Sequence, residues 1–313
     1  MRVAILDDIH EAYGATEGVR RLRERVEVNI FTKSFGDPSV LAGFDALVAN
    51  RERTRFTREL LEQLPGLRII AQTGTHVNHI DLGAAEQRGV VVAKAAAGYS
   101  FGAVELTIGL MIGLMRQIPA HDRAVKCGKW STPVTPALNG KTLGIVGFGS
   151  IGRHVARVGQ SLGMRVVAWG PRLTSRGAEE VDVEVRPLDE LLVTADVVSI
   201  HAALNSGSRG LIDARRIGLM KPSAYLLNTA RGQIVEESAL VKALADGRIA
   251  GAGLDVFEEE PLPPGHPLTI LSNVLLTPHM GWTTDVRYGL FAQGAAEVLL
   301  AYLEGKDVPC FAR

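Results

Sequence analysis

Near the middle of the chain, a short apolar run leads directly into a glycine-rich turn. Residues 143–146 are typical of a buried strand, and Gly-x-Gly-x-x-Gly follows at 147–152. An amphipathic helix is expected over 151–162, so the turn would join a strand to a helix. This arrangement is typical of a dinucleotide site, in which the glycines permit a tight turn, the approach of a pyrophosphate, and close helix–strand packing.

The surroundings of the turn strengthen this interpretation, because glycine-rich turns alone are common structural features. Gly163 is placed to end the helix, and a second strand is expected over 165–169. The sequence therefore predicts a strand–helix–strand unit whose helix N-terminus offers unpaired N–H groups to phosphates. A purely structural turn is the alternative.

Composition limits the function classes that remain. The chain has 313 residues, enough for two domains, and 46% of them are hydrophobic. Lys plus Arg number 34 and Asp plus Glu number 34, so the formal net charge is zero. Nucleic-acid or membrane-surface binding usually requires a basic excess, so we expect neither partner.

Cysteine usage and the N-terminus bear on location. Cys127 and Cys310 are too few for a disulfide framework or a metal cage, so we expect a reduced, cytoplasmic protein without a metal. The first eight residues are typical of a strand ending in acids, so no signal peptide is expected. No apolar run reaches the roughly 20 residues that a membrane-spanning helix needs.

Apolar runs alternate with helical stretches along the chain, which indicates parallel sheets covered by helices. The first series of predicted strands lies at residues 3–6, 26–30, 46–49, 67–71 and 90–92. The second series lies at residues 143–146, 165–169, 197–200, 225–228, 253–256 and 274–277. A long apolar helix is expected over 103–118, and a final helix reaches about residue 303 without a strand series after it.

The final helix suggests how the domains are connected. Because it has no strand series of its own, we expect it to pack on the first domain. A dinucleotide-binding domain over 99–283 is then inserted into a substrate domain made of 1–98 and 284–313. The predicted fold class is α/β, with a doubly wound Rossmann domain inserted into a doubly wound, flavodoxin-like domain. We expect a hinge at the two chain crossings and a substrate cleft between the domains.

Three polar side chains follow predicted strands of the second series. They are Arg231, Glu260 and His279. Ligands bind outside the carboxyl ends of strands in an open parallel sheet, so all three are expected beside the glycine turn. The guanidinium matches a carboxylate, the imidazole exchanges protons near neutral pH, and the carboxylate orients the imidazole. This set fits hydride transfer to a 2-oxo acid, whereas each residue alone fits a surface or structural role.

Further residues are expected to line the two binding sites. Asp255 is expected to hold the nicotinamide, with a local cap as the alternative. The residues expected to line the cofactor site are Gly147, Gly149, Ser150, Ile151, Gly152, Gly170, Arg172, Thr229, Ala230 and Asp255. Backbone N–H groups of Thr75, His76 and Val77 are expected to form a nest for an anionic substrate beside Arg231 and His279, unless this segment is a plain turn.

These motifs resemble those of the D-isomer-specific 2-hydroxyacid dehydrogenase family, which includes phosphoglycerate dehydrogenases and glyoxylate/hydroxypyruvate reductases. The resemblance covers essentially the whole chain, through the segments 73–82, 143–152, 228–232, 252–261 and 277–281, together with Glu105 and His201. It implies that Arg231, Glu260 and His279 form the catalytic set. It also implies a substrate domain split between the two chain ends, and a homodimer that uses the long helix after Gly98.

The chain departs from the family pattern at three places. Family members that use NAD typically have an acid at the end of the second cofactor strand, where this chain has Gly170, followed by Arg172 and Arg176. Because these arginines are suited to a 2′-phosphate, we expect NADP to be accepted and preferred over NAD. His76 stands where a glycine is common, and Lys94 where an asparagine is usual, so the substrate pocket is expected to be atypical.

The sequence therefore predicts an NAD(P)-dependent oxidoreductase acting on the CH–OH group of a small 2-hydroxy acid, or on the matching 2-oxo acid. Glyoxylate, hydroxypyruvate and a phosphoglycerate-like acid are candidate substrates. One alternative is a non-enzymatic, dinucleotide-sensing dimer of the corepressor type. Another is an enzyme that oxidises a different small anion, such as formate or phosphite.

Overall fold

The structure is a computed structural model that describes the chain except residues 75–76, 96–100, 131–132, 172, 175–180 and 313. Contacts divide the chain into two compact units. Unit 1 comprises Met1–Tyr99 and Thr283–Arg313, and unit 2 comprises Ser100–Trp282. Substrate residues Thr75 and His76, the cofactor residue Arg172, and Arg176 lie outside the described residues.

Unit 1 is built on a six-stranded sheet with the order β13-β5-β4-β3-β1-β2. Its strands are β1 (Arg2–Ile5), β2 (Glu27–Ile30), β3 (Ala46–Ala49), β4 (Ile69–Gln72), β5 (Val91–Lys94) and β13 (Cys310–Ala312). All pairs are parallel except β13 with β5. The order 2-1-3-4-5 of the parallel strands is that of flavodoxin-like sheets.

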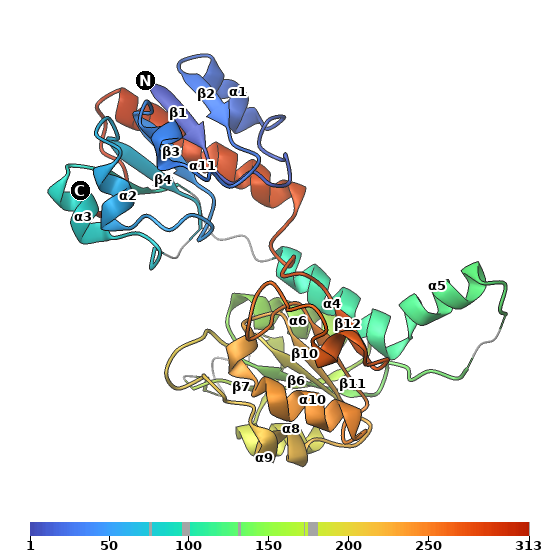
Figure 1. Cartoon of the computed structure of the whole chain (residues 1–313). Helices are drawn as coiled ribbons and strands as arrows, with labels where there is room; N and C mark the ends of the chain where they lie inside the picture. Colours follow the sequence, from blue (N-terminus) through green and yellow to red (C-terminus); the bar gives the residue numbers. More distant parts are fainter. Residues whose placement is uncertain (75–76, 96–100, 131–132, 172, 175–180, 313) are drawn as a thin grey trace. The chain divides into compact units, whose positions relative to one another are not determined.

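Helices cover both faces of this sheet (Figure 1). They are α1 (Glu17–Arg23), α2 (Arg58–Glu62), α3 (Leu82–Gln87), α11 (Asp285–Leu303) and the short 3₁₀ helix η1 (Pro38–Leu41). Side-chain oxygens cap their first turns, as when Asp81 accepts a hydrogen bond from the backbone N–H of Ala84. α11 packs on α1 and β4 although it comes from the far end of the chain, and therefore completes unit 1.

Unit 2 is built on a seven-stranded parallel sheet with the order β12-β11-β10-β9-β6-β7-β8. Its strands are β6 (Thr142–Val146), β7 (Arg165–Trp169), β8 (Glu184–Val185), β9 (Val197–Ile200), β10 (Tyr225–Asn228), β11 (Gly251–Leu254) and β12 (Val274–Leu276). Counted from β6, the order is 3-2-1-4-5-6-7, the doubly wound order of dinucleotide-binding sheets. The predicted fold class is confirmed.

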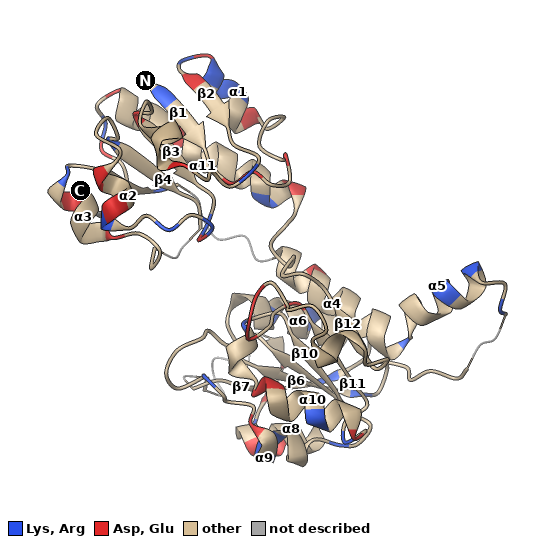
Figure 2. Ribbon diagram, viewed as in Figure 1, with Lys and Arg blue, Asp and Glu red and all other residues tan. Residues whose placement is uncertain are grey.

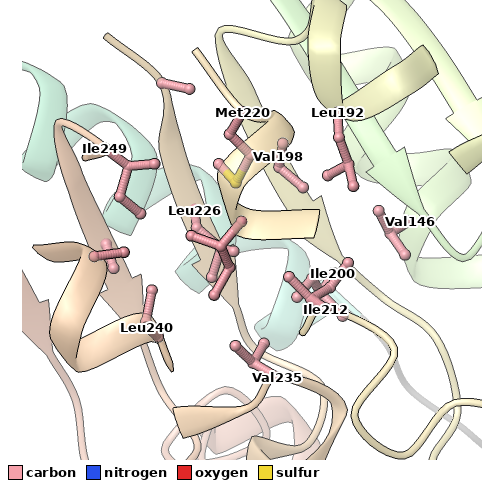
Figure 3. Close-up of a cluster of buried hydrophobic side chains, with 14 of the residues drawn as sticks. Val146, Leu192, Val198, Ile200, Ile212, Met220, Leu226, Val235, Leu240 and Ile249 are labelled. Atoms are coloured by element: carbon pink, nitrogen blue, oxygen red, sulfur yellow. The ribbon is translucent and has the colours of Figure 1, made fainter. Parts of the chain in front are cut away.

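Unit 2 contains several helices, most of which cover its sheet. They are α4 (Phe101–Met115), α5 (Ile118–Lys126), α6 (Ser150–Ser161), α8 (Leu188–Thr194), α9 (Ala214–Leu219), α10 (Glu237–Ala245) and the 3₁₀ helices η3 (Gly232–Ile234) and η4 (Pro267–Thr269). α4 and α6 contact one face of the sheet, while α8, α9 and α10 enclose an aliphatic core on the other. Figure 3 shows part of this second core, in which Ile200 and Leu226 of the strands belong to the same cluster as Leu240 of α10.

The predicted helix over 103–118 is interrupted. Its last turn ends because Gln117 takes a left-handed backbone (φ 50°), and α5 starts a new direction with Pro119 in its first turn. α5 has no buried residue, carries basic side chains in its last turn, and extends away from the sheet of unit 2 (Figures 1 and 2). In the described residues no single helix meets the length and hydropathy needed to span a membrane; α4 and α5 do so only as a pair bent by 61°.

Candidate active site

The site in unit 2 lies along the carboxyl edge of its sheet. In the strand register, Val146, Ile200, Asn228, Leu254 and Leu276 are neighbours at the ends of five strands. The glycine turn, His201, Asp255 and the segment leading to His279 each begin directly after one of these residues, and Arg231 lies three residues after Asn228. The sheet therefore brings together segments that are separated by up to 130 residues in the sequence.

The glycine turn has the shape expected for a pyrophosphate site. Gly147 has a φ of +98°, and a Cβ atom there would lie 2.4 Å from the backbone nitrogen of Ala202. A Cβ atom on Gly152 would lie 2.3 Å from the carbonyl oxygen of Gly147, so the helix packs tightly on the turn. Gly149 instead faces open space and is the N-cap of α6. These residues fit a dinucleotide, which needs an open approach to a helix N-terminus.

The first turn of α6 holds the remaining turn residues. Ser150 and Ile151 begin the helix, and Ile151 also packs against the core below α6. The carbonyl oxygen of Ser150 lies 2.7 Å from Nδ1 of His154. The guanidinium of Arg153 stacks on the Phe148 ring, 5.0 Å from its centroid, which stabilises the loop side of the turn.

The end of β7 carries no acidic side chain. A Cβ atom on Gly170 would lie 3.4 Å from Cβ of Leu173 and 3.6 Å from the backbone nitrogen of Phe148. Gly170 therefore lies beside the glycine turn, where the ribose of a dinucleotide is usually held.

His279 and Glu260 form the central pair of the site. Nδ1 of His279 lies 2.6 Å from Oε2 of Glu260, and the backbone N–H of Phe257 donates to Oε1 of the same carboxylate at 3.0 Å. Because a carboxylate only accepts hydrogen bonds, we assign the ring proton to Nδ1, which leaves Nε2 to exchange a proton with a ligand. About a third of each side chain is exposed, so the pair is reachable from solvent.

Electrostatics keep Glu260 ionised. Burial acts to raise the pKa of this carboxyl, but the hydrogen bonds from His279 and Phe257 and the positive charges of His279 and Arg231 outweigh it. The pKa of Glu260 therefore lies below its usual value, and the carboxylate is available to hold and stabilise a protonated imidazole.

Arg231 lies close enough to act on Glu260 electrostatically. Its Nη1 donates to the carbonyl oxygen of Ala230 at 2.7 Å, and its own carbonyl oxygen accepts from Nδ2 of Asn228 at 2.9 Å. Oδ1 of Asn228 accepts from the backbone N–H of Ala230, and Oγ1 of Thr229 lies 2.8 Å from Oγ1 of Thr107 on α4. The strand end that carries Arg231 is thus held by side-chain hydrogen bonds on both sides.

The carboxylate of Asp255 accepts hydrogen bonds from the segment that carries His279. Its Oδ1 accepts from Oγ1 of Thr277 at 2.6 Å and from the N–H of Met280 at 2.8 Å, while Oδ2 accepts from the N–H of Gly281 at 2.9 Å. Burial raises the pKa of this carboxyl, although the three hydrogen bonds oppose the shift. In this structure both oxygens hold the segment that carries His279.

That segment has a strained backbone. His279 has a φ of +52°, in the left-handed region that non-glycine residues seldom adopt, at a cost of about 1–3 kcal/mol. The hydrogen bonds of Asp255 on the residues after His279, and the bond from the His279 N–H to the carbonyl of Thr277, fix this conformation. The strain therefore falls on the residue whose ring faces Glu260.

Of the predicted substrate nest, only Val77 lies within the described residues. It follows β4 in unit 1, is half-buried, and its carbonyl oxygen accepts a hydrogen bond from the backbone N–H of Ile80. Arg231 and His279, the other predicted substrate residues, belong to unit 2.

His201 lies at the same sheet edge but was not among the predicted catalytic or binding residues. It follows β9, its backbone N–H donates to the carbonyl of Val146, and its Nε2 lies 2.8 Å from Oγ of Ser199. Burial lowers the pKa of His201 to about 4. The imidazole is therefore neutral at pH 7, which fits a structural contact beside the glycine turn better than proton exchange.

This shift predicts a specific loss of stability in mild acid. Between the usual pKa of 6.5 and about 4, the unfolded chain binds a proton at this histidine that the folded chain does not, so the free energy of unfolding falls as pH drops through that window. From pH 7.5 to 5 we expect His201 to account for about 2 kcal/mol of that fall. Urea unfolding at both pH values should show a smaller loss for His201→Gln than for wild type; equal losses would contradict the assignment.

The site can be compared with known proteins. Residues 108–281 match the family model described as "D-isomer specific 2-hydroxyacid dehydrogenase, NAD binding domain". The chain belongs to this family. The predicted class, a nicotinamide-dependent 2-hydroxyacid dehydrogenase, is confirmed at the level of the family, and the matched domain supports a nicotinamide cofactor.

Curated relatives carry more than one name. A glyoxylate reductase from Aeropyrum pernix is 40% identical over 264 residues, which cover 82% of this chain and 79% of the relative. A D-3-phosphoglycerate dehydrogenase from Methanocaldococcus jannaschii is 35% identical over 96% of this chain, which spans only 56% of that relative.

Solved structures agree on the fold. A phosphoglycerate oxidoreductase from Vibrio cholerae superposes with a TM-score of 0.88 at 33% identity, over 97% of this chain and 99% of the other. The apo D-lactate dehydrogenase from Escherichia coli gives a TM-score of 0.88 at 26% identity, over 99% of both chains.

Proposed function

We propose that the protein transfers a hydride between a nicotinamide cofactor and a small 2-oxo or 2-hydroxy acid. The observation that carries the proposal is the Glu260–His279 pair, with its 2.6 Å contact, on the same sheet edge as the glycine turn. A dinucleotide-sensing protein without enzymatic activity would not need a histidine oriented by a carboxylate there. The bound cofactor supplies the hydride in reduction and accepts it in oxidation.

Each residue of the pair and its neighbour has a distinct role. Arg231 binds the carboxylate of the acid through two N–H groups of its guanidinium. Nε2 of His279 donates a proton to the 2-oxo oxygen during reduction and takes it back from the hydroxyl during oxidation. Glu260 keeps the ring in position and stabilises its protonated form by accepting from Nδ1.

The cofactor is held by the residues of the turn and of the neighbouring strand ends. Gly147, Gly149 and Gly152, with the first turn of α6, take the pyrophosphate. We propose that NADP is preferred over NAD, because Gly170 stands where an acid would repel a 2′-phosphate and because Arg172 and Arg176 follow it in the sequence.

Unit 1 is the proposed substrate domain and unit 2 the cofactor domain. Unit 1 has the flavodoxin-like order, and the segment 75–77 follows its strand β4. The substrates that fit are short 2-oxo acids, of which glyoxylate and hydroxypyruvate are the first to test. Cytoplasmic location, and the absence of nucleic-acid and membrane partners, stay predictions.

A homodimer is the proposed assembly. α5 and the residues after it expose Ile118, Val125, Trp130 and Val134, with Trp130 at 87% and Val134 at 102% relative exposure. Exposed apolar side chains on a projecting helix are suited to burial against a second copy. Light scattering should give a mass near twice the 33.6 kDa of one chain, and Val125→Asp should shift it toward one.

Absorbance at 340 nm tests the function. The purified protein is assayed against a panel of short 2-oxo acids with NADH and with NADPH, and formate and phosphite are included as donors for the oxidised cofactors. We expect turnover of at least one 2-oxo acid and a higher kcat/KM with NADPH. A strong NADH preference that Arg172→Ala leaves unaffected would contradict the cofactor proposal. Turnover of formate or phosphite alone would show that the substrate is a different small anion.

A further inference from the structure

The loop over residues 257–266, which carries Glu260, contacts the segment that follows Arg231. At its start, the backbone of Phe257 runs against Gly232, where a Cβ atom would lie 2.0 Å from the Phe257 carbonyl. Only glycine permits this approach, so the backbone of Gly232 directly contacts the backbone of Phe257 at the start of the loop.

Two side chains then bind the next residue of the loop. Nε2 of Gln233 donates to the carbonyl oxygen of Glu258 at 3.0 Å, and the backbone N–H of Glu258 donates to Oε2 of Glu237 at 3.0 Å. Gln233 lies in η3 and Glu237 begins α10, so both come from the segment after Arg231. The backbone N–H and carbonyl groups of Glu258 are therefore both bound by side chains of the segment that follows Arg231.

The carboxylate of Glu237 also binds His266, at the C-terminal end of the loop. Nε2 of His266 lies 3.2 Å from Oε1 of Glu237, and the two side chains are only 18% and 16% exposed. Because Nδ1 of His266 accepts from the N–H of Leu268, Nε2 carries the ring proton and donates it to Glu237. One half-buried carboxylate thus joins both ends of the loop that has Glu260 near its middle.

We propose that Glu237 is a positioning residue that acts through Glu260, which deepens the proposed function and rests on it. The loop is held at residues 258 and 266, so Glu260 is fixed between two anchored points. Since Glu260 orients His279, and misplacement by about 1 Å can cost on the order of a hundredfold in rate, release of the loop slows proton exchange without removing a catalytic group.

The test compares Glu237→Ala with Glu259→Ala, a matched control that removes the same charge from an exposed acid of the loop. We expect Glu237→Ala to lower kcat about tenfold or more while the KM for the cofactor changes by less than about twofold, because the glycine turn is untouched. Glu259→Ala should keep the wild-type kcat. Glu237→Gln, which keeps the size and one acceptor oxygen, should fall between wild type and Glu237→Ala.

A double-mutant cycle separates positioning from general destabilisation. In a Glu260→Gln background, Glu237→Ala should cost less than about twofold further in kcat, because residues that act through one another are not additive. Effects that multiply fully, or an unchanged kcat in Glu237→Ala, would overturn the proposal.

Amide hydrogen exchange provides a measurement that needs no substrate. The N–H of Phe257 is bonded to Glu260, not to Glu237, so its exchange reports whether Glu260 has moved. We expect it to exchange at least about fivefold faster in Glu237→Ala than in wild type or Glu259→Ala. Unchanged protection of the Phe257 N–H would overturn the positioning proposal, whether or not the wild type reduces a 2-oxo acid. Failure of the wild type to reduce any 2-oxo acid would by itself refute only the proposed function.

Discussion

Replacing His279 with alanine is expected to slow reduction of 2-oxo acids by about a hundredfold to ten-thousandfold. The ring is the one proton donor proposed for the reaction, and its Nδ1 is already bound to Glu260. The loss should appear in kcat, because the carboxylate of the acid is bound by Arg231 and the cofactor by the glycine turn. Steady-state kinetics at 340 nm measure it.

Two further measurements make this result specific to the imidazole. Cofactor binding, followed by tryptophan fluorescence, should stay within about twofold of wild type, since no turn residue is changed. Glu260→Gln should reduce kcat less than His279→Ala, because the ring keeps its Nε2 and loses only the orienting charge. Wild-type turnover in His279→Ala would show that another group supplies the proton.

Replacing Arg231 with lysine should weaken substrate binding although the positive charge is kept. A guanidinium places two parallel N–H groups on a carboxylate, whereas an ammonium acts as a single point. Loss of one charge-assisted hydrogen bond, about 1.5–3 kcal/mol, corresponds to roughly a tenfold to hundredfold fall in kcat/KM for the acid. Arg231→Ala loses both bonds and should be more severe.

The matched control for this series is Arg215→Lys, on an exposed arginine of α9 that pairs with Asp189. It should leave kcat/KM unchanged, since it makes the same chemical change at an arginine whose guanidinium pairs with Asp189 and has no role in the proposed site. If Arg231→Lys also kept the wild-type kcat/KM, a different residue would bind the carboxylate.

Much of the fold could be predicted because its strands are short apolar runs with regular spacing. β6, β9 and β10 lie at or within one residue of their predicted ranges. Two strands were missed for a physical reason. β8 has two residues and β13 three, and β13 pairs antiparallel with β5 at the sheet edge, so neither forms a run long enough to be recognised.

The site was predicted unevenly. Glu260 and His279 were expected to meet because each follows a strand of one parallel sheet, and the register of that sheet determines which ends are neighbours. For Asp255 the sequence left a nicotinamide contact and a local cap open, since hydrogen bonds from backbone N–H groups 25 and 26 residues away leave no local pattern. The same holds for the contact between Glu237 and His266, which depends on how a loop folds back.

The division of unit 1 between the two ends of the sequence has a consequence for biosynthesis. A ribosome completes all of unit 2 before it adds residues 283–313, which supply α11 and β13. Unit 2 has every strand it needs at that moment, and domains generally fold as units during translation. Unit 1 is begun first, but its sheet keeps the surface that α11 covers exposed until translation ends. We therefore expect unit 1 to be the part of the nascent chain that most needs a chaperone.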